Sequence, residues 1–416
     1  MKVRIHRGTQ EIGGTCIELE EEGKRIVLDV GLPLDAGESS DMEDLLPQVK
    51  GFRQKDDSLL AVIISHPHQD HFGLAKFIRP QLPIAIGSAA RSILETATFF
   101  SPAGASFKNT IPLKDRDPFV LGPFKIIPFL VDHSAYDAYS LLIEAGGKCL
   151  FYSGDFRAHG QKAALFEKLI KNPPKDIDVL FMEGTTLGRK SKDESLTEDD
   201  LVCDYLNVFK ETGGFCLVWT SSQNIDRIVT IFKACKKADR QLIMDLYTAE
   251  ILRATGNDNI PQGTWKGVRI YLPEFQRRDV KRKKMFDIVN RYRTNRIFPE
   301  NLAEEAGQSV LLFRPRMAGD LESAECLKDA SLVYALWEGY LKMDSQRPFL
   351  AWLARNNISM THIHTSGHAS SSALKRFAES LNPKVLVPIH TFHPEEYLGI
   401  FPRVETKEDG IWWEVN

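Results

Sequence analysis

Three histidines and an aspartate fall within six consecutive residues, in the motif HPHQDH at positions 66–71. His66 and His68 alternate with a proline, so both side chains can point to one side of an extended loop. Asp70 and His71 follow at the expected start of a helix and can face a second point nearby. Imidazole and carboxylate groups together are ligands for zinc or, less often, manganese. Four such groups exceed what one open catalytic metal needs from a single loop, so the motif predicts two metal ions side by side.

Other side chains that bind metals or transfer protons follow apolar runs rich in β-branched residues. The run LLAVII at residues 59–64 leads into HPHQDH, and such runs are typical of buried strands. The same arrangement recurs at Asp29, His133, Asp155, Glu183 and His390. Taken alone, a residue such as Asp29 could equally be a turn residue. The repetition predicts a site assembled from loops at one edge of a sheet.

The elements that must position these residues begin with short strands and glycine turns. Strands are expected at residues 3–5, 16–19 and 25–31, joined by hairpins, which indicates an antiparallel or mixed sheet. Helices are expected at residues 73–78 and 89–99. The motif at 66–71 thus lies between a buried strand and a helix.

The composition limits the class of protein. With 416 residues and 43% hydrophobic residues, the chain can bury a sizeable core and form two or three domains. A net charge of −3 excludes a molecule that is basic overall, so any basic surface must be local. The six cysteines form no CxxC pair, the N-terminus shows no apolar signal segment, and no apolar run approaches the length of a membrane span. We therefore expect a cytoplasmic protein with reduced cysteines and no membrane contact.

The composition changes near Gly188, where a charged and polar stretch begins. Residues 189–200 are expected as a linker, and beyond them helices alternate with strands, which predicts a separate parallel α/β domain. Histidines return at residues 362–368 and at His390, so the end of the chain is expected to rejoin the first domain. An inserted domain of this kind would form a cleft above the metals. The predicted parts are a core over 1–189, an inserted cap over 190–360 and the rest of the core over 361–416.

A basic segment lies between predicted strands of the cap. Residues 276–296 hold nine basic side chains and only two acidic ones. A charge run is commonly a solvated helix face, but in an acidic protein it can also follow a phosphate backbone. Both interpretations stay open, with Arg277, Lys281 and Lys284 as the candidate RNA contacts.

The series of motifs resembles the β-CASP branch of the metallo-β-lactamase superfamily, whose members are nucleic-acid hydrolases. HTSGHAS at 364–370 and NPKVLVPIHTF at 382–392 look most like ribonuclease J, whereas MEGTTLG at 182–188 looks more like the 3′-end-processing endonucleases of the family. The resemblance covers residues from about 10 to 400. It implies an α/β fold: a metallo-β-lactamase αββα sandwich with an inserted α/β β-CASP cap. The additional C-terminal domain of ribonuclease J is not expected here, so assembly through it is not implied, although a homo-oligomer stays open.

The resemblance also implies a role for each ligand-type residue. One metal would be held by His66, His68 and His133, and the other by Asp70, His71 and His390. Asp155 would bridge the two metals, and Asp29 would support the metal loop by hydrogen bonding. His368 would be the general acid, oriented by Glu183, and Asp70 would be both a ligand and catalytically essential.

These roles imply a hydrolase acting on single-stranded RNA with two zinc ions, or manganese. A hydroxide activated by the two metals would attack phosphorus, and His368 would protonate the leaving 3′ oxygen. The products would carry a 5′-phosphate and a 3′-hydroxyl. His364, Ser366 and Gly367 are expected to contact substrate phosphate, although a loop held by its own hydrogen bonds is an equal alternative.

Other functions remain open. DNA-repair members of the family tend to carry valine where this chain has His390, so His390 favours RNA over DNA. A small-molecule metallo-hydrolase is disfavoured by the cap, His368 and Glu183. A non-catalytic nucleic-acid-binding subunit is disfavoured because every ligand position is kept. The motifs do not separate endonuclease from 5′-exonuclease action.

Overall fold

The computed structural model describes residues 1–37, 41–188 and 196–416. The chain forms two compact units, which we call unit 1 (Met1–Lys192 and Gly367–Asn416) and unit 2 (Asp193–Ser366). The expected boundary after residue 189 and most of the expected linker lie outside the described residues. Within the described ranges, no helix combines the length and the apolar character that a membrane crossing requires.

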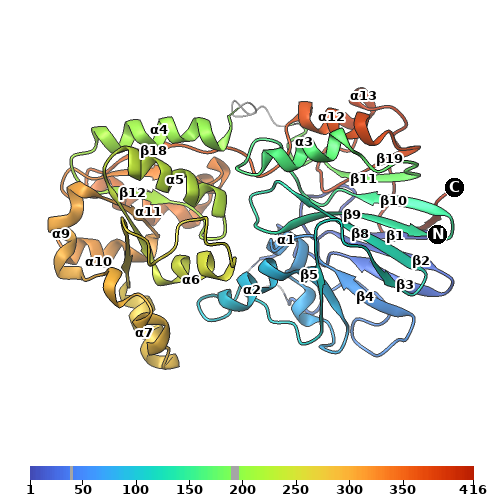
Figure 1. Ribbon diagram of the computed structural model, residues 1–416, viewed down its shortest axis with the longest axis horizontal. Coiled ribbons are helices and arrows are strands. Elements are labelled where there is room, and N and C mark those ends of the chain that lie inside the picture. Colours follow the sequence, from blue (N-terminus) through green and yellow to red (C-terminus); the bar gives the residue numbers. More distant parts are fainter. Residues whose placement is uncertain (38–40, 189–195) are drawn as a thin grey trace. The chain divides into compact units, whose positions relative to one another are not determined.

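Two β-sheets form the centre of unit 1 (Figure 1). The first has seven strands in the order β20 (Trp412–Glu414), β1 (Lys2–Arg7), β2 (Cys16–Glu21), β3 (Lys24–Leu28), β4 (Leu59–Ile63), β5 (Ile84–Gly87) and β6 (Thr110–Leu113). The second has six, in the order β19 (Val385–Ile389), β11 (Val179–Glu183), β10 (Lys148–Tyr152), β9 (Ala138–Ala145), β8 (Phe124–Val131) and β7 (Phe119–Leu121). Both sheets are mixed: β1 and β2 are antiparallel, for example, whereas β3 and β4 are parallel.

Apolar side chains on both faces of these sheets produce four layers. Alternate residues such as Val3 and Ile5 of β1 point into the core between the sheets, where they meet Leu141 and Ile143 of β9. The helices that cover the outer faces are α1 (Gln69–Phe72) and α2 (Ser88–Ala97) on the first sheet, and α3 (Ala163–Lys171), α12 (Ser371–Leu381) and α13 (Glu396–Ile400) on the second. The predicted αββα sandwich is confirmed.

Parallel strands of unit 1 bring their carboxyl ends together at the sheet edges. In the second sheet β10, β11 and β19 are parallel neighbours, and Glu183 pairs in register with Ile389, directly before His390. In the first sheet Leu28 pairs with Ile63, so Asp29 lies beside the loop that follows β4. Residues placed directly after such strands can therefore meet, as ligand sites at the carboxyl ends of parallel strands require.

One predicted helix of unit 1 is wrong. Residues 73–78 form only a 3-10 turn, Ala75–Phe77, which follows the four-residue helix α1. The amide of Leu74 donates to the carbonyl of Val30 at 3.0 Å, so the backbone bonds to the neighbouring loop rather than continuing a helix. The expected helix at 89–99 is confirmed as α2.

Unit 2 is built on one parallel sheet (Figure 1). Its seven strands lie in the order β15 (Arg296–Ile297), β14 (Val268–Tyr271), β13 (Gln241–Asp245), β16 (Ser309–Leu312), β12 (Cys216–Trp219), β17 (Ser331–Tyr334) and β18 (Ser359–His362). Its helices are α4 (Glu198–Glu211), α5 (Ile225–Lys237), α6 (Leu246–Ala254), α7 (Glu274–Lys283), α8 (Phe286–Asn290), α9 (Leu302–Glu305), α10 (Ala318–Ser323) and α11 (Arg347–Arg355). Every strand pair in this sheet is parallel, which confirms the predicted α/β arrangement.

Candidate metal centre

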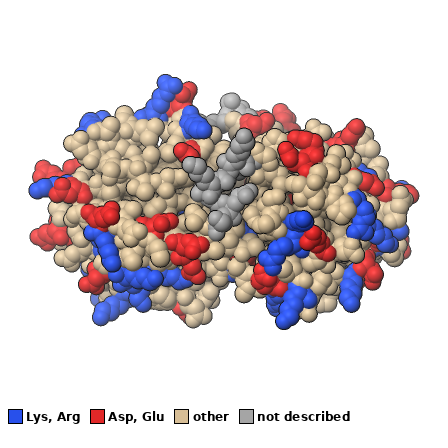
Figure 2. Space-filling view, turned by 90° about the horizontal axis from the view of Figure 1, so that it is seen from above, with Lys and Arg blue, Asp and Glu red and all other residues tan. Residues whose placement is uncertain are grey.

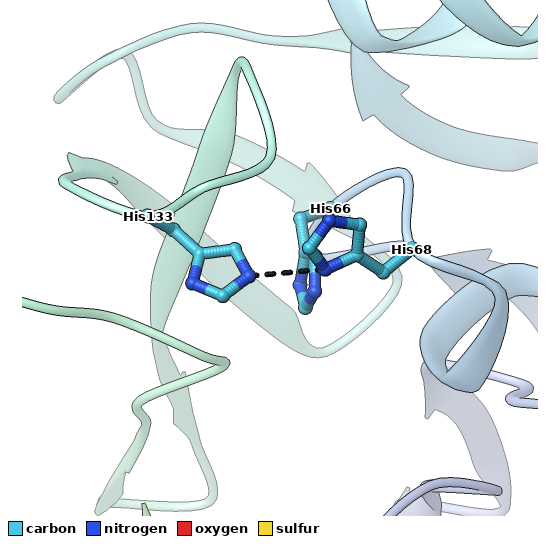
Figure 3. Close-up of side chains that lie close together, drawn as sticks. All are labelled: His66, His68 and His133. Atoms are coloured by element: carbon cyan, nitrogen blue, oxygen red, sulfur yellow. Dashed lines mark hydrogen bonds between the residues drawn. The ribbon is translucent and has the colours of Figure 1, made fainter. Parts of the chain in front are cut away.

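Three histidines from two loops of unit 1 point toward one another (Figure 3). His66 and His68 lie on the loop between β4 and α1, and His133 follows β8. His133 Nε2 lies 3.1 Å from His68 Nδ1, and the ring centroids of His66 and His133 are 4.6 Å apart. One ring nitrogen from each histidine lies within 4.8 Å of the others, which suits a shared metal ion.

A second group lies beside the first. Asp70 and His71 belong to α1, Asp155 follows β10 and His390 follows β19. Asp155 Oδ2 lies 3.1 Å from His71 Nε2 and 3.7 Å from His390 Nε2, and Asp70 Oδ2 lies 3.6 Å from His390 Nε2. The same Asp155 oxygen is 3.6 Å from His66 Nε2, so Asp155 lies between the two groups. The structure thus brings together all seven residues predicted as ligands.

Burial keeps most of these imidazoles neutral. It holds the pKa of His66 and of His133 well below the usual range and lowers that of His68 to about 4. A neutral imidazole keeps a lone pair that can bind a metal ion. His71 differs: burial lowers its pKa, but the carboxylates of Asp155 and Asp29 outweigh that effect and raise it.

Buried polar atoms without partners show that the donor set fits divalent metal ions. His66 Nε2, His390 Nε2 and Asp155 Oδ1 are buried and have no hydrogen-bond partner among the described residues. Such orphaned groups are rare because leaving them unsatisfied costs free energy. Nitrogen and carboxylate oxygen atoms converging on two points would be satisfied by divalent metals, and the site has the chemistry to hold them.

Asp29 braces the loop that carries the first histidines. Its carboxylate is fully buried and accepts hydrogen bonds from the Ser65 amide at 2.7 Å, the Ser65 hydroxyl at 2.7 Å, His71 Nδ1 at 2.8 Å and the Tyr152 hydroxyl. Donation by Nδ1 leaves His71 Nε2 directed at Asp155. Neither Ser65 nor Tyr152 was identified from the sequence as a partner of Asp29, although Ser65 follows the end of β4 by two residues and Tyr152 is the last residue of β10.

Close backbone approach holds α1 in place. A Cβ atom at Gly31 would lie 1.7 Å from the backbone oxygen of Asp70, so this position requires glycine.

His390 has φ of 51°, a left-handed conformation that is uncommon outside glycine. Its Nδ1 lies 2.9 Å from the Thr15 hydroxyl, which fixes the ring with Nε2 toward Asp155. Thr15 was not identified from the sequence.

His368 and Glu183 form a pair beside the metal groups. His368 Nδ1 lies 3.2 Å from Glu183 Oε2 and 3.6 Å from Asp155 Oδ2. Glu183 also accepts from the amides of Phe156 and Thr185, each at 3.2 Å. Burial disfavours a charged His368, but the carboxylates of Glu183 and Asp155 outweigh it and raise its pKa. The pair can therefore hold a proton next to the ligands.

A buried ion pair that was not identified from the sequence includes the residue directly before His133 in the chain. Asp132 accepts from Arg157 Nε at 3.3 Å and from the Gly160 amide at 2.7 Å, and both charged side chains are fully buried. A Cβ atom at Gly160 would lie 2.3 Å from Asp132 Oδ1. The sequence could have pointed to this pair only through its position, because Asp132 directly precedes His133 and Arg157 follows Asp155 by two residues.

The predicted substrate contacts lie on several elements. In unit 2, His364 Nδ1 lies 3.3 Å from the carbonyl oxygen of Ala335, and Ser366 ends the unit. The pKa of His364 is lowered to about 3, mainly by burial and in second place by the positive charge of Arg227. The ring is therefore neutral at pH 7. In unit 1, Gly367 packs against Ser134, whose Oγ would lie 2.6 Å from an added Cβ.

The basic residues of the 276–296 segment lie mainly on α7, which projects from the rest of its unit (Figure 1). Arg277, Lys281 and Lys284 are exposed. Arg277 lines a cavity of about 530 Å³ together with acidic side chains such as Glu274 and Asp320. On the face of the molecule shown in Figure 2, basic and acidic side chains are likewise interspersed. The predicted RNA contacts of this segment stay a prediction.

Comparison with known proteins shows similarity in sequence to one family model and to ribonucleases, and in fold to a solved structure. Residues 32–202 match the model of the Beta-lactamase superfamily domain. Ribonuclease J of Mycoplasma genitalium is 23% identical over 404 residues, covering 94% of this chain and 67% of that protein. Ribonuclease J of Helicobacter pylori is 22% identical over 412 residues, covering 94% and 56%. The crystal structure of a protein of unknown function from Enterococcus faecalis V583 shares the fold, with a TM-score of 0.78 over 99% of each chain and 22% identity.

Proposed function

This chain belongs to the metallo-β-lactamase superfamily, and from that premise we propose that it is a metal-dependent ribonuclease. It would hydrolyse phosphodiester bonds of single-stranded RNA and leave a 5′-phosphate and a 3′-hydroxyl. The observation that carries the proposal is the position of His368, 3.6 Å from the carboxylate shared by two groups of metal-type ligands and 3.2 Å from Glu183.

Two divalent ions, zinc or manganese, would occupy the two ligand groups. His66, His68 and His133 would hold one ion, Asp70, His71 and His390 the other, and Asp155 would contact both. Ions bound there would lower the pKa of a water molecule and stabilise charge on the oxygens of an in-line displacement at phosphorus. The chain itself supplies the fixed geometry: Asp29 holds the His71 ring, and Thr15 holds the His390 ring.

His368 would donate the proton that the leaving 3′ oxygen needs. An alkoxide is a poor leaving group, so protonation by a positioned acid accelerates cleavage. Glu183 would keep the ring oriented, since its other oxygen is fixed by the Phe156 amide at 3.2 Å. Cleavage of the bond between phosphorus and the 3′ oxygen would leave a 3′-hydroxyl on the departing fragment and the phosphate on the 5′ end of the downstream fragment.

RNA is the favoured substrate. Similarity to ribonuclease J over 94% of the chain supports RNA, and a histidine at 390 completes the second ligand group. His364, Ser366 and Gly367 would contact the RNA backbone, and the exposed Arg277, Lys281 and Lys284 would add charge attraction. A DNA nuclease and a small-molecule metallo-hydrolase are the competing functions.

The experiment uses end-labelled single strands of one sequence, as RNA and as DNA, each with a 5′-phosphate. Wild type, His368→Ala and His393→Ala are incubated with added zinc or manganese. His393 is the matched control, because its ring is 44% exposed and bonds to Glu395. Cleavage of RNA that is lost only in His368→Ala is expected, and the ladder of products distinguishes endonuclease from 5′-exonuclease action. Cleavage of DNA alone, or of neither strand by metal-loaded protein, would refute the proposal.

A further inference from the structure

A fully buried arginine in unit 2 bonds to the segment that carries His364. Arg227 lies on α5 and has no exposed surface. Its Nη1 donates to the carbonyl oxygens of Ala335 at 3.2 Å and Ile363 at 3.5 Å, and its Nη2 donates to that of Thr365 at 3.3 Å. One guanidinium therefore holds backbone on both sides of His364.

These carbonyl groups belong to chain that has just left the sheet. Ala335 follows β17 and Ile363 follows β18, so ladder hydrogen bonds no longer satisfy them. The planar guanidinium has five N–H donors in a fixed fork, which suits it to several acceptors at once. The Ala335 oxygen also accepts from His364 Nδ1 at 3.3 Å, so the same atom orients both the arginine and the imidazole.

A carboxylate fixes the arginine from the other side. Glu198 accepts from Arg227 Nε at 3.1 Å and from Nη2 at 3.2 Å, and it accepts from the Thr230 hydroxyl at 2.9 Å. The Thr365 hydroxyl donates to the carbonyl of Leu196 at 2.8 Å, which ties the segment to the chain just before α4. A buried pair with this many additional hydrogen bonds defines one geometry.

We propose that Arg227 is a positioning residue for substrate binding. It sets the conformation of residues 363–365 and thereby places His364 and Ser366 where they contact the backbone of single-stranded RNA. The inference rests on the proposed ribonuclease function, and it assigns a role to a residue that touches neither substrate nor metal. Arg227 acts on RNA affinity, whereas the metal groups of unit 1 act on hydrolysis.

Arg227→Lys tests this role because it keeps the charge but replaces the fork by a single ammonium group. The affinity for a 3′-fluorescein-labelled, 5′-phosphorylated single-stranded RNA is measured by fluorescence anisotropy in EDTA, where the proposed metal dependence predicts no cleavage. We expect a loss of affinity on the order of ten-fold, which corresponds to about 1.4 kcal/mol of binding free energy. Metal content and hydrolysis of bis(p-nitrophenyl) phosphate, a small phosphodiester, are expected to be unchanged.

Arg240→Lys is the matched control. Arg240 also donates to three backbone carbonyl groups of unit 2, those of Thr212, Gly214 and Ser309. These lie where β12 and β16 begin, whereas the carbonyls held by Arg227 lie beyond the ends of β17 and β18. If RNA binding is weakened merely because an arginine loses hydrogen bonds to carbonyl groups, the affinity should fall equally in Arg227→Lys and Arg240→Lys.

Two further variants decide between positioning and mere stability. If Arg227 acts through His364, then Arg227→Lys weakens RNA binding little in a His364→Ala background, which a double-mutant cycle detects. Should Arg227→Lys fold poorly, Arg227→Met with Glu198→Gln removes both buried charges together and undergoes the same cycle.

The outcomes separate the two proposals. Weaker RNA binding in Arg227→Lys alone, coupled to His364→Ala, supports the inference. Unchanged RNA binding, or an equal loss in Arg240→Lys, or full additivity with His364→Ala, overturns the inference while leaving the ribonuclease function intact. Wild-type protein that hydrolyses the small phosphodiester but neither binds nor cleaves RNA overturns the proposed function and the inference with it.

Discussion

Replacing Asp29 by asparagine is expected to weaken one metal site selectively. Asp29 Oδ2 accepts from the Ser65 hydroxyl, from His71 Nδ1 and from the Tyr152 hydroxyl, while Oδ1 accepts from the Ser65 amide. The new amide NH₂ would face donors at either position. If the NH₂ group takes the place of Oδ1, it faces the Ser65 amide, and the two donors repel each other. If it takes the place of Oδ2, it faces His71 Nδ1, which must then accept a hydrogen bond. The imidazole proton of His71 would therefore move to Nε2. Nε2 is the atom directed at Asp155, so it could no longer bind a metal ion.

The magnitude follows from the bonds lost. A hydrogen bond to a charged group contributes about 1.5–3 kcal/mol, so Asp29→Asn should lower the free energy of unfolding of metal-free protein by about 2 kcal/mol. Loss of an outer partner of a ligating histidine typically costs about 10–100-fold in metal affinity. We expect that loss at the site of Asp70, His71 and His390, with the His66, His68 and His133 site affected less.

Two measurements check this prediction. Isothermal titration of metal-stripped protein with zinc separates the two sites, and urea unfolding in EDTA gives the change in stability. Asp57→Asn is the control, because that carboxylate is 79% exposed and pairs only with a surface lysine among the contacts of the described residues. Unchanged affinity at both sites in Asp29→Asn, with unchanged urea midpoint, would refute the reasoning.

Three further predictions follow from other parts of unit 1. Asp70→Asn should abolish RNA cleavage and reduce the metal content from two ions to one per chain, as measured by elemental analysis; full activity with added metal would contradict the assignment. Asp132→Asn should destabilise the protein by about 3 kcal/mol, because it breaks a buried ion pair, and should weaken the metal site that contains His133; urea unfolding and zinc titration check both effects. Burial raises the pKa of Glu18, but hydrogen bonds from His6 and Arg25 outweigh it and lower the pKa. The stability that Glu18 contributes is therefore fully present above its unfolded pKa of about 4.3 and is lost as the pH falls through its lower folded pKa. The difference in unfolding free energy between wild type and Glu18→Gln should shrink on acidification, and a difference independent of pH would exclude this pair as its source.

Much of the fold could be predicted because local patterns carried the information. Apolar runs that end in ligand-type residues placed His66, Asp155 and His390 after strands, and the structure has β4, β10 and β19 at those positions. The change from mixed strands to alternating helices and strands likewise indicated a separate parallel sheet. Local sequence failed where a long-range contact decided the backbone, as at residues 73–78, where Leu74 bonds to Val30.

The groups that hold the ligands in place could not be predicted in the same way. Thr15 meets His390 across 375 residues of chain, and Arg227 meets Thr365 across 138. Threonine and arginine are common residues without a distinctive spacing, so only the folded structure shows which imidazole and backbone groups their side chains hold. The types of the ligands and the ends of the strands can be predicted from neighbouring residues in the sequence, whereas the supporting hydrogen bonds depend on how distant strands pair.

Stepwise return of zinc or manganese to metal-stripped protein, while cleavage of end-labelled single-stranded RNA is followed, tests the central claim most directly. The proposed centre predicts no cleavage without metal, a maximum at two equivalents per chain, and no cleavage by Asp70→Asn at any ratio. Full cleavage by the stripped protein in EDTA, or saturation at one equivalent, would contradict a two-metal ribonuclease.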